Sequence, residues 1–309
     1  MLVMLYDIIV IGSGPAGLSA AIYAKRAELN LLVIEKASIS GGQIINTYEV
    51  DNYPGIPGIG GFELSLKLRE HADKFGADFV TGEVSDFSLE GEIKVITLDD
   101  GSKYESKSVV IATGGEPRHL GVPGETKLSG MGVSYCATCD GAFFKNKTVT
   151  VVGGGDVAIE DAIFLARICK QVYVVHRRDQ FRAAKSITSK LLELENVTIL
   201  WDSVVEAIEG EDKVERMVVK NLKTEEVTTY DVAGVFIAVG YLPNSEAYKK
   251  VVAVDGAGYI LAGENCETNI PGIYAAGDVR TKDLRQIITA ASDGANAITA
   301  VEKYLNHLS

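Results

Sequence analysis

The chain is poor in the residues that mark several large classes of protein. It has 4 cysteines, 7 prolines and 1 tryptophan in 309 residues, and no apolar run approaches the ~18 residues that a membrane-spanning helix needs. So few and such scattered cysteines do not form the framework of a disulfide-rich secreted domain. The formal net charge is −12 without a basic block, which argues against a nucleic acid or a membrane as partner.

The N-terminal residues Met1–Leu5 are apolar but have no basic flank, and they lead through Asp7 into a glycine-rich turn. We interpret them as the approach to a strand and not as a signal peptide. A cytoplasmic location is therefore expected, where a close cysteine pair is more often catalytic or metal-binding than structural.

A dinucleotide-binding fingerprint follows directly. The apolar run Asp7–Ile11 predicts a strand buried on both faces, and a helix is expected from Leu18 to about Ala27. The next strand, Leu31–Ile34, ends on Glu35, about twenty residues after the turn, as in nucleotide-binding βαβ units. Glycines in such a turn let the backbone approach a pyrophosphate at the helix N-terminus. The turn consists of Gly12, Ser13, Gly14, Pro15, Ala16 and Gly17.

A second copy of the fingerprint lies near the middle of the chain. The strand Thr148–Val152 leads through a glycine turn into a helix, Val157–Ile168, and then into the strand Val172–Val175. Its predicted cofactor contacts are Gly153, Gly155, Asp156, Val157 and Ala158.

The two copies differ in the residues that follow their second strand. Glu35 can accept hydrogen bonds from a ribose 2′-hydroxyl but repels a 2′-phosphate, whereas arginines bind phosphate through charge-assisted contacts. The second copy carries His176, Arg177, Arg178 and Arg182 at this place. Because one dinucleotide cannot usefully pass hydride to itself, FAD in the first site and NADPH in the second is the economical interpretation. A solvated basic turn is the alternative for residues 176–178.

Cys136 and Cys139 form the chain's one C-x-x-C motif. This spacing favours a reversible, redox-active disulfide, although a zinc site and a structural disulfide are alternatives. Asp140 is a candidate proton donor and acceptor for the thiolates, or else a cap for a helix that begins near Gly141. The remaining cysteines (Cys169, on the expected helix, and Cys266, in a polar loop) and the single histidines (His71, His119 and His307) receive no role.

In this order, the motifs resemble the low-molecular-weight, bacterial-type thioredoxin reductases of the pyridine nucleotide-disulfide oxidoreductase family. Shorter stretches agree with that family at 41–43, 49–55, 111–114, 275–278 and 285–286. The resemblance implies that the counterpart of Asp278 contacts the ribityl chain of the flavin. It implies flavin contacts at Lys36, Gly41, Gly42, Gln43, Asn52, Ala112, Thr113, Gly114, Gly277, Asp278, Arg285, Gln286 and Ile287, beside Glu35 and the first turn.

The resemblance also implies an α/β fold with two Rossmann-like, three-layer ββα domains. An FAD domain of residues 1–116 and 247–309 is expected to be interrupted by an NADPH domain of residues 117–246, which carries the disulfide. Gly- and Pro-containing stretches at 114–117 and 240–244 independently suit hinges at both joints.

The implied activity passes electrons from NADPH through FAD and the disulfide to thioredoxin. By the family pattern Cys139 faces the flavin and Cys136 attacks the partner, and the two domains rotate so that disulfide and nicotinamide take turns. A homodimer without a metal is implied as well.

One departure from the family concerns the segment after Asp140. The family often has an aromatic pair directly after Cys-Asp-Gly, used to dock thioredoxin, whereas this chain has Ala142, Phe143 and Phe144. Thioredoxin remains the expected acceptor, with a different docking surface. A peroxide-reductase partner and a thioredoxin-like protein such as a glutaredoxin are the alternatives. Alternative functions are a ferredoxin-dependent relative, which the arginines of the second copy disfavour, a flavin dithiol oxidase, and a non-catalytic flavin redox sensor.

Overall fold

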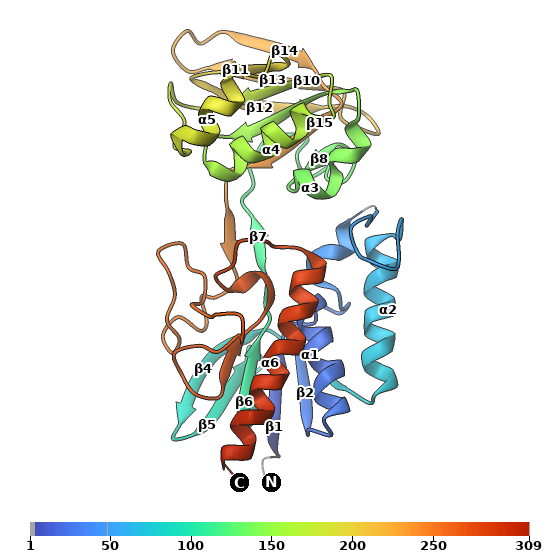
Figure 1. The fold of residues 1–309 in the computed structure, drawn as a ribbon, viewed down its shortest axis with the longest axis vertical. Coiled ribbons are helices and arrows are strands. Elements are labelled where there is room, and N and C mark those ends of the chain that lie inside the picture. Colours follow the sequence, from blue (N-terminus) through green and yellow to red (C-terminus); the bar gives the residue numbers. More distant parts are fainter. Residues whose placement is uncertain (1–3, 48, 309) are drawn as a thin grey trace. The chain divides into compact units, whose positions relative to one another are not determined.

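A computed structural model describes residues 4–47 and 49–308, and this part of the chain divides into two compact units (Figure 1). Unit 1 comprises Met1–Glu116 and Leu242–Ser309, and unit 2 comprises Pro117–Tyr241. Residues 1–3 of the expected approach to the first strand lie outside the described residues. Each unit is taken by itself below.

Unit 1 combines one large sheet with three long helices. Its elements, where η marks a 3₁₀ helix, are β1 (Leu5–Ile11), α1 (Pro15–Arg26), β2 (Leu31–Glu35), η1 (Gly42–Asn46), α2 (Gly61–Lys74), β3 (Asp78–Thr81), β4 (Val84–Glu90), β5 (Ile93–Leu98), β6 (Lys103–Ile111), β17 (Ile273–Ala275), η3 (Gly277–Val279) and α6 (Ile287–Leu308). Within the described residues the sheet has seven strands, in the order β3-β2-β1-β6-β5-β4, with β17 also paired to β6. β1, β2, β3, β6 and β17 pair parallel, whereas β4, β5 and β6 pair antiparallel.

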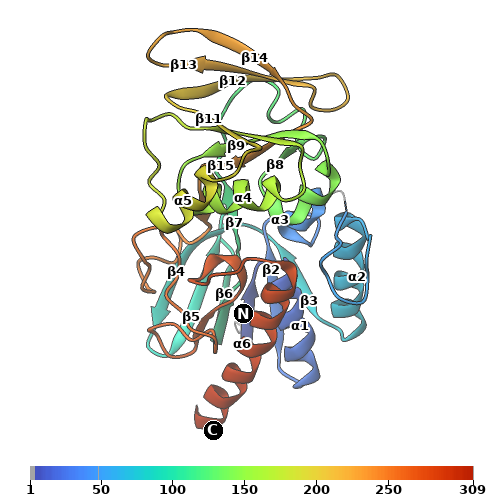
Figure 2. The same cartoon turned by 45° about the horizontal axis from the view of Figure 1, so that its top comes forward.

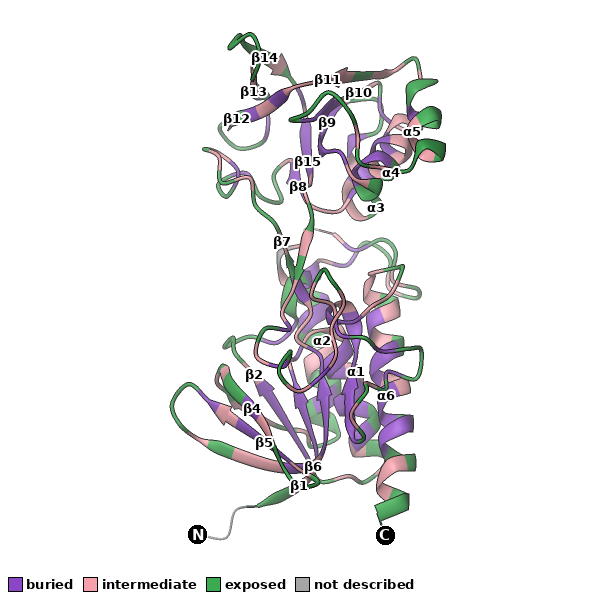
Figure 3. Ribbon diagram, turned by 90° about the vertical axis from the view of Figure 1, so that its left-hand side faces the viewer, coloured by how far each residue is buried: buried purple, intermediate pink, exposed green. Residues whose placement is uncertain are grey.

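The alternation along β1 explains the layers of unit 1. Successive side chains of a strand point to opposite faces of a sheet. Ile8 and Val10 pack with side chains of α1 and α6, whereas Ile9 and Ile11 pack with side chains of β4 and β5 such as Phe87. Because β1 is buried on both faces, its sequence is a continuous apolar run, as expected. Figure 3 shows the inner strands of this sheet largely in the colour of buried residues.

Unit 2 repeats this arrangement. Its elements are β8 (Val133–Ser134), α3 (Ala137–Asp140), η2 (Gly141–Phe144), β9 (Thr148–Gly153), α4 (Asp156–Ala166), β10 (Gln171–Val175), α5 (Lys185–Leu192), β11 (Val197–Leu200), β12 (Ser203–Glu209), β13 (Arg216–Asn221), β14 (Val227–Asp231) and β15 (Gly234–Ala238). The parallel sheet has the order β11-β10-β9-β15-β8, and β12, β13 and β14 form an antiparallel sheet (Figure 2). Val149 and Val151 of β9 pack with α4, and Val152 packs with the antiparallel sheet. The expected α/β fold with two Rossmann-like, three-layer ββα domains is confirmed.

The chain crosses between the units twice, in β7 (Gly115–Pro117) and β16 (Tyr241–Pro243), and these two strands pair with each other. The return to unit 1 occurs at Leu242, whereas the sequence placed it at residue 247. Asn244 explains the difference, because its backbone N–H donates to the carbonyl of Gly114 at 3.0 Å and so ties this stretch to unit 1.

Two helix boundaries differ from the expectation. α1 begins at Pro15 and not at Leu18, because proline suits the first helical position, where no N–H partner is needed. α4 ends at Ala166, so Cys169 lies beyond the helix and not on it. Among the described helices, none combines the length and the apolar character that crossing a bilayer requires.

Candidate active site

The first glycine turn, between β1 and α1, has the backbone that a dinucleotide site requires. Gly12 has a φ of +101°, and a Cβ here would overlap the carbonyl oxygen of Ala112. A Cβ at Gly17 would overlap the carbonyl oxygen of Gly12, so α1 can approach the turn this closely only with glycine. At Gly14 the nearest described atom to a Cβ is 3.9 Å away. The protein therefore packs tightly around Gly12 and Gly17, at the two ends of the turn. The space beside Gly14, in the middle, is free, so a pyrophosphate can approach the backbone there.

Glu35, at the end of β2, is bonded to this turn. Its Oε2 accepts the backbone N–H and the hydroxyl of Ser13, both at 2.7 Å, and its Oε1 accepts the N–H of Ala37 at 2.9 Å. A carboxylate offers about four lone-pair positions, so these three donors leave room for a ribose hydroxyl. The predicted contacts Pro15 and Ala16 form the first residues of α1.

The predicted contacts at residues 41–43 lie beside the first turn. The N–H of Gly41 donates to the carbonyl of Ser13 at 2.8 Å, and a Cβ on Gly42 would lie 3.4 Å from the Cα of Gly14. Gly41 and Gly42 have φ values of +134° and +59°, which favour glycine. The structure therefore joins two motifs that are separated in the sequence.

Two of the predicted contacts after β6, Thr113 and Gly114, are bonded to Asn244, which the sequence had placed only in a hinge. Thr113 donates its hydroxyl to the carbonyl of Asn244 at 2.7 Å, and the Asn244 amide donates back to the carbonyl of Thr113 at 3.1 Å. The exposed Lys36 instead pairs with Glu116 at 3.4 Å.

The side chain of Asp278, in η3, has one carboxylate oxygen whose hydrogen bonding is incomplete. Its Oδ1 is buried and has no hydrogen-bond partner among the described residues. Burial raises the pKa of Asp278, and the charges of Lys282 and Arg285 oppose this shift. A buried acceptor without a donor is unfavourable, so the site fits a ligand that brings a hydroxyl, as the ribityl chain of FAD does.

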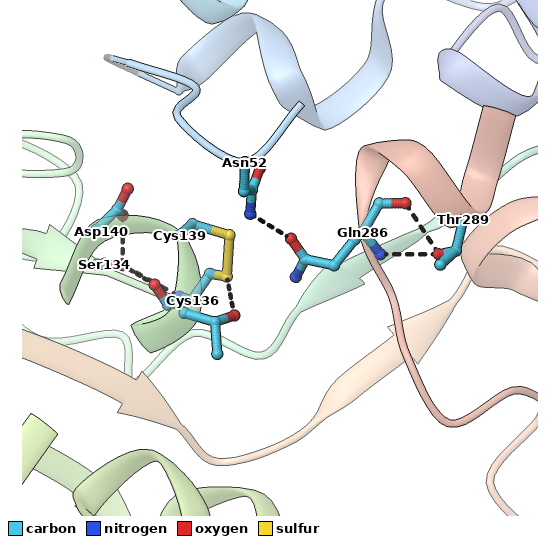
Figure 4. The surroundings of a disulfide bond; sticks show 8 residues. Asn52, Ser134, Cys136, Cys139, Asp140, Gln286 and Thr289 are labelled. Carbon is cyan, nitrogen blue, oxygen red and sulfur yellow. Dashed lines mark hydrogen bonds between the residues drawn. A yellow bond between two sulfur atoms is a disulfide. The ribbon is translucent and has the colours of Figure 1, made fainter. Parts of the chain in front are cut away.

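Asn52 and Gln286 are far apart in the sequence but bonded in unit 1. The Nδ2 of Asn52 donates to the Oε1 of Gln286 at 2.7 Å (Figure 4). Arg285 lies over the ring of Tyr259 at 4.1 Å, and α6 begins at Ile287. Four predicted contacts, Asn52 and residues 285–287, therefore lie together at the start of α6.

A buried charged cluster next to Asp278 was missed by the sequence analysis. Asp293 of α6, 4% exposed, accepts the N–H of Gly277 at 2.9 Å, two bonds from Arg280 at 2.8 and 2.7 Å, and one from Lys282 at 2.8 Å. Burial alone would raise the pKa of Asp293, but hydrogen bonds from Arg280 and Lys282 hold it below its ordinary value. Asp293 thereby fixes the backbone of η3. The available sign was an acid at helical spacing among the small and apolar residues of α6, such as Ala290 and Ala297.

The second glycine turn, between β9 and α4, has the same plan. A Cβ at Gly153 would overlap the carbonyl oxygen of Ala238, whereas a Cβ at Gly155 would meet no described atom within 4 Å. The third position holds the buried Ala158 instead of a glycine, and the neighbouring Val157 is 66% exposed. This turn also leaves an open backbone at its middle position.

His176 lies beneath the second turn and not on its surface. Its ring covers Gly154, where a Cβ would overlap it, and its Nε2 lies 3.0 Å from the carbonyl oxygen of Gln180. Burial lowers the pKa of His176, and the charges of Arg182 and Arg178 add to this. His176 therefore supports the turn, and its burial favours the neutral form of the ring.

The three arginines of the second site are exposed. Arg177, Arg178 and Arg182 make no ion pair with any residue that the structure describes. The loop that carries them is held in place, because the N–H of Arg182 donates to the carbonyl of Gly154 at 2.8 Å and Asp156 Oδ1 accepts another backbone N–H at 2.8 Å. Arginines without acidic partners fit a phosphate group such as the 2′-phosphate of NADPH.

Cys136 and Cys139 form a disulfide, with their Cα atoms 5.3 Å apart (Figure 4). Cys136 is the N-cap of the short helix α3, which follows β8, Cys139 lies within that helix, and both cysteines are half-buried. The hydroxyl of Thr138 lies 3.4 Å from the Sγ of Cys136. Within residues 4–47 and 49–308, His, Cys, Asp and Glu side chains form no cluster of three that could hold a metal ion.

Asp140 is directed toward β8. Its Oδ2 accepts a hydrogen bond from the hydroxyl of Ser134 at 2.6 Å, and its side chain does not cap η2, so the capping interpretation is wrong. Burial raises the pKa of Asp140, although the bond from Ser134 opposes this shift. A carboxyl group that keeps its proton to a higher pH beside a disulfide is suited to proton transfer.

The other two cysteines are free and buried. Burial raises the pKa of Cys169 to about 11 and that of Cys266 to about 12. Thiols of this kind stay protonated at neutral pH and react poorly.

Comparison with known proteins agrees with this geometry. A family model described as "Pyridine nucleotide-disulphide oxidoreductase" matches residues 6–294. A "Thioredoxin reductase" of Peptoclostridium acidaminophilum is 47% identical over 307 residues, 97% of each chain. One of Bacillus subtilis is 45% identical over 306 residues, 98% of this chain and 96% of the relative.

A solved structure agrees as well. The crystal structure of thioredoxin reductase from Streptococcus pyogenes has a TM-score of 0.94 and 46% identity, and the match covers 98% of this chain and 99% of that one. Two open glycine turns and a disulfide are what an enzyme needs to move electrons between a pyridine nucleotide and a dithiol. The chain therefore belongs to the pyridine nucleotide-disulphide oxidoreductase family.

Proposed function

We propose that the chain is an NADPH-dependent enzyme that reduces the disulfide of thioredoxin through its Cys136–Cys139 pair. The observation that carries this proposal is the combination, in one chain, of that disulfide with two differently charged nucleotide turns. Relatives that are 43–47% identical to this chain over nearly its whole length bear the name thioredoxin reductase.

Unit 1 holds FAD in this proposal. The first turn and residues 41–43 receive the pyrophosphate, Glu35 receives a ribose hydroxyl, and Asp278 receives the ribityl chain. Lys36, Asn52, residues 112–114 and residues 285–287 complete the site. When bound, FAD supplies the electron transfer between the pyridine nucleotide and the disulfide.

Unit 2 holds NADPH in this proposal. The open backbone at Gly155 receives the pyrophosphate, and the exposed arginines receive the 2′-phosphate. His176 does not contact the nucleotide in this proposal; its ring packs against Gly154 and supports the glycine turn. Asp156 anchors the loop that carries the arginines, so it acts on the same site.

The disulfide chemistry balances with two electrons and two protons. These convert Cys136–Cys139 into two thiols, and the ionised carboxylate of Asp140 then takes the proton of Cys136, which becomes a thiolate. The thiolate of Cys136 attacks a sulfur of the thioredoxin disulfide and forms a mixed disulfide. Cys139 then loses its proton and attacks the Cys136 sulfur, which breaks the mixed disulfide and restores the pair. The proton of Cys139 and the proton held by Asp140 pass to the two thioredoxin sulfurs, which leave as a dithiol.

Substitution of Cys136 by serine separates the two halves of this scheme. We expect Cys136→Ser to keep flavin bleaching by NADPH in an anaerobic titration and to lose essentially all reduction of thioredoxin. Cys169→Ser, at a buried free thiol, is the control and keeps both activities. Thioredoxin reduction by Cys136→Ser would contradict the role of the pair.

The same titration of the unmodified protein separates the alternative functions. Bleaching of the flavin by reduced ferredoxin but not by NADPH would favour a ferredoxin-dependent enzyme. Rapid recovery of the flavin absorbance with O₂ and a small dithiol would favour a dithiol oxidase. A flavin redox sensor would show no turnover. A homodimer and a cytoplasmic location belong to the same proposal, and light scattering of the purified protein tests the first of these.

A further inference from the structure

Ser134 is a buried hydroxyl next to the disulfide that the scheme above does not use. It is the last residue of β8, whose neighbour in the sheet is β15, and it is 5% exposed. Cys136 follows two residues later, where the chain turns into α3. The short strand therefore holds Ser134 in a fixed place beside the redox pair.

The hydroxyl of Ser134 makes two directed hydrogen bonds. It donates to the Oδ2 of Asp140 at 2.6 Å, and it accepts the backbone N–H of Cys136 at 3.1 Å. A hydroxyl has one proton, and the 2.6 Å contact to a carboxylate is stronger than the 3.3 Å contact to the carbonyl of Cys136. Ser134 therefore links the carboxylate of Asp140 directly to the backbone of Cys136.

The carboxylate of Asp140 depends on the side chain of Ser134 for its hydrogen bonding. Among the described residues, Ser134 provides the only hydrogen bond to its carboxylate, and no ion pair reaches it. α4 packs against α3 and carries the acids Asp156, Glu160 and Asp161, none of which is bonded to Asp140. η2 carries no titratable side chain. Orientation and charge of Asp140 are thus governed by burial and by Ser134.

We propose that Ser134 is a positioning residue for the disulfide chemistry, which keeps the carboxylate of Asp140 and the backbone of Cys136 in one hydrogen-bonded unit. This rests on the proposed role of Asp140 in holding a proton. A donor to a carboxylate favours its charged form, so Ser134 limits the rise in pKa that burial imposes on Asp140. Without the hydroxyl, Asp140 stays buried and loses its donor, and its pKa rises further.

The experiment is a set of pH profiles of thioredoxin reduction by the FAD-loaded enzyme. In Ser134→Ala we expect the rise in rate that accompanies ionisation of Asp140 to move to higher pH by about 1–2 units, the size that corresponds to one hydrogen bond to a charged group. In Ser134→Thr, which keeps the hydroxyl, the profile stays where it is in the unmodified enzyme. An unmoved profile in Ser134→Ala overturns the proposal.

Asp140→Asn distinguishes failure of this inference from failure of the proposed function. If Asp140→Asn keeps both the rate and the profile, the role of Asp140 is wrong. If Asp140→Asn removes the pH-dependent rise, the double variant Ser134→Ala/Asp140→Asn should show no further shift. A shift that persists in the double variant shows that Ser134 acts only on the fold, and overturns the inference.

A serine of similar burial elsewhere controls for the loss of a hydroxyl. Ser108 is 0% exposed and donates to the carbonyl of Asp7 at 2.7 Å in unit 1. Ser108→Ala should leave the profile unmoved. Ser134→Gly, which also lacks the hydroxyl, is the second variant if Ser134→Ala yields no folded protein, and flavin content and thermal unfolding report the fold of every variant.

Discussion

The two glycine turns follow one plan but differ at the third position and in the charge that follows. In the first turn a Cβ at Gly17 would overlap backbone, and the adjacent Glu35 is bonded to the turn itself. In the second turn Ala158 takes the third position, and the adjacent arginines have no acidic partner within the described residues. The backbone plan admits a dinucleotide, and the residues after the second strand select which one.

The largest loss of stability and of bound cofactor should come from substitution of Gly17, the third glycine of the first turn. Gly17→Ala places a methyl group into the carbonyl of Gly12, and we expect a loss of about 3 kcal/mol or more in stability of unit 1, together with most of its bound FAD. Flavin absorbance per protein and thermal unfolding measure this. Gly155→Ala, whose Cβ meets open space, should keep the stability and weaken NADPH binding alone. Equal losses of stability in Gly17→Ala and Gly155→Ala would contradict the difference in packing between these two positions.

A smaller effect is expected from the arginines. Arg177→Ala should weaken NADPH binding by about 1.5–3 kcal/mol, or ~10- to 150-fold, because a charge-assisted bond to phosphate is lost. NADH binding, which involves no 2′-phosphate, should not change. Titration with both nucleotides measures the preference, and an unchanged preference for NADPH would count against the assignment of the second site.

The smallest effect is expected at Glu35. Glu35→Gln keeps an acceptor for Ser13 but loses the charge, so FAD binding should weaken by about 1 kcal/mol, or ~5-fold. Flavin release followed by fluorescence measures it. If NADPH binding weakened instead, the assignment of the two turns would have to be exchanged.

Sequence patterns revealed most of the fold because the two turns and their flanking strands are local features. Continuous apolar runs such as Asp7–Ile11 identified the strands, and the C-x-x-C spacing identified the disulfide. Helix starts were less well placed, since Pro15 was counted with the turn although it opens α1.

Long-range bonds were not predictable. Asp293 bonds Gly277 and Arg280 because α6 presents one particular face to η3, and Asn244 bonds Thr113 only after the chain has returned from unit 2. His176 reads in the sequence as part of a basic surface cluster, yet its ring packs against Gly154. Such contacts depend on the packing of elements, which periodicity does not encode.

The pairing of β17 with β6 has a consequence for the order in which the chain folds during its synthesis. Ile273 lies beside Val109, so a central strand pair of unit 1 joins residues on both sides of the whole of unit 2. Unit 2 has all its strands once residue 241 has emerged, whereas unit 1 still lacks β17 and α6. At about 5–20 residues per second, the ribosome adds that last stretch only several seconds later. The inserted unit can therefore be finished while the unit that surrounds it still waits for its closing strand.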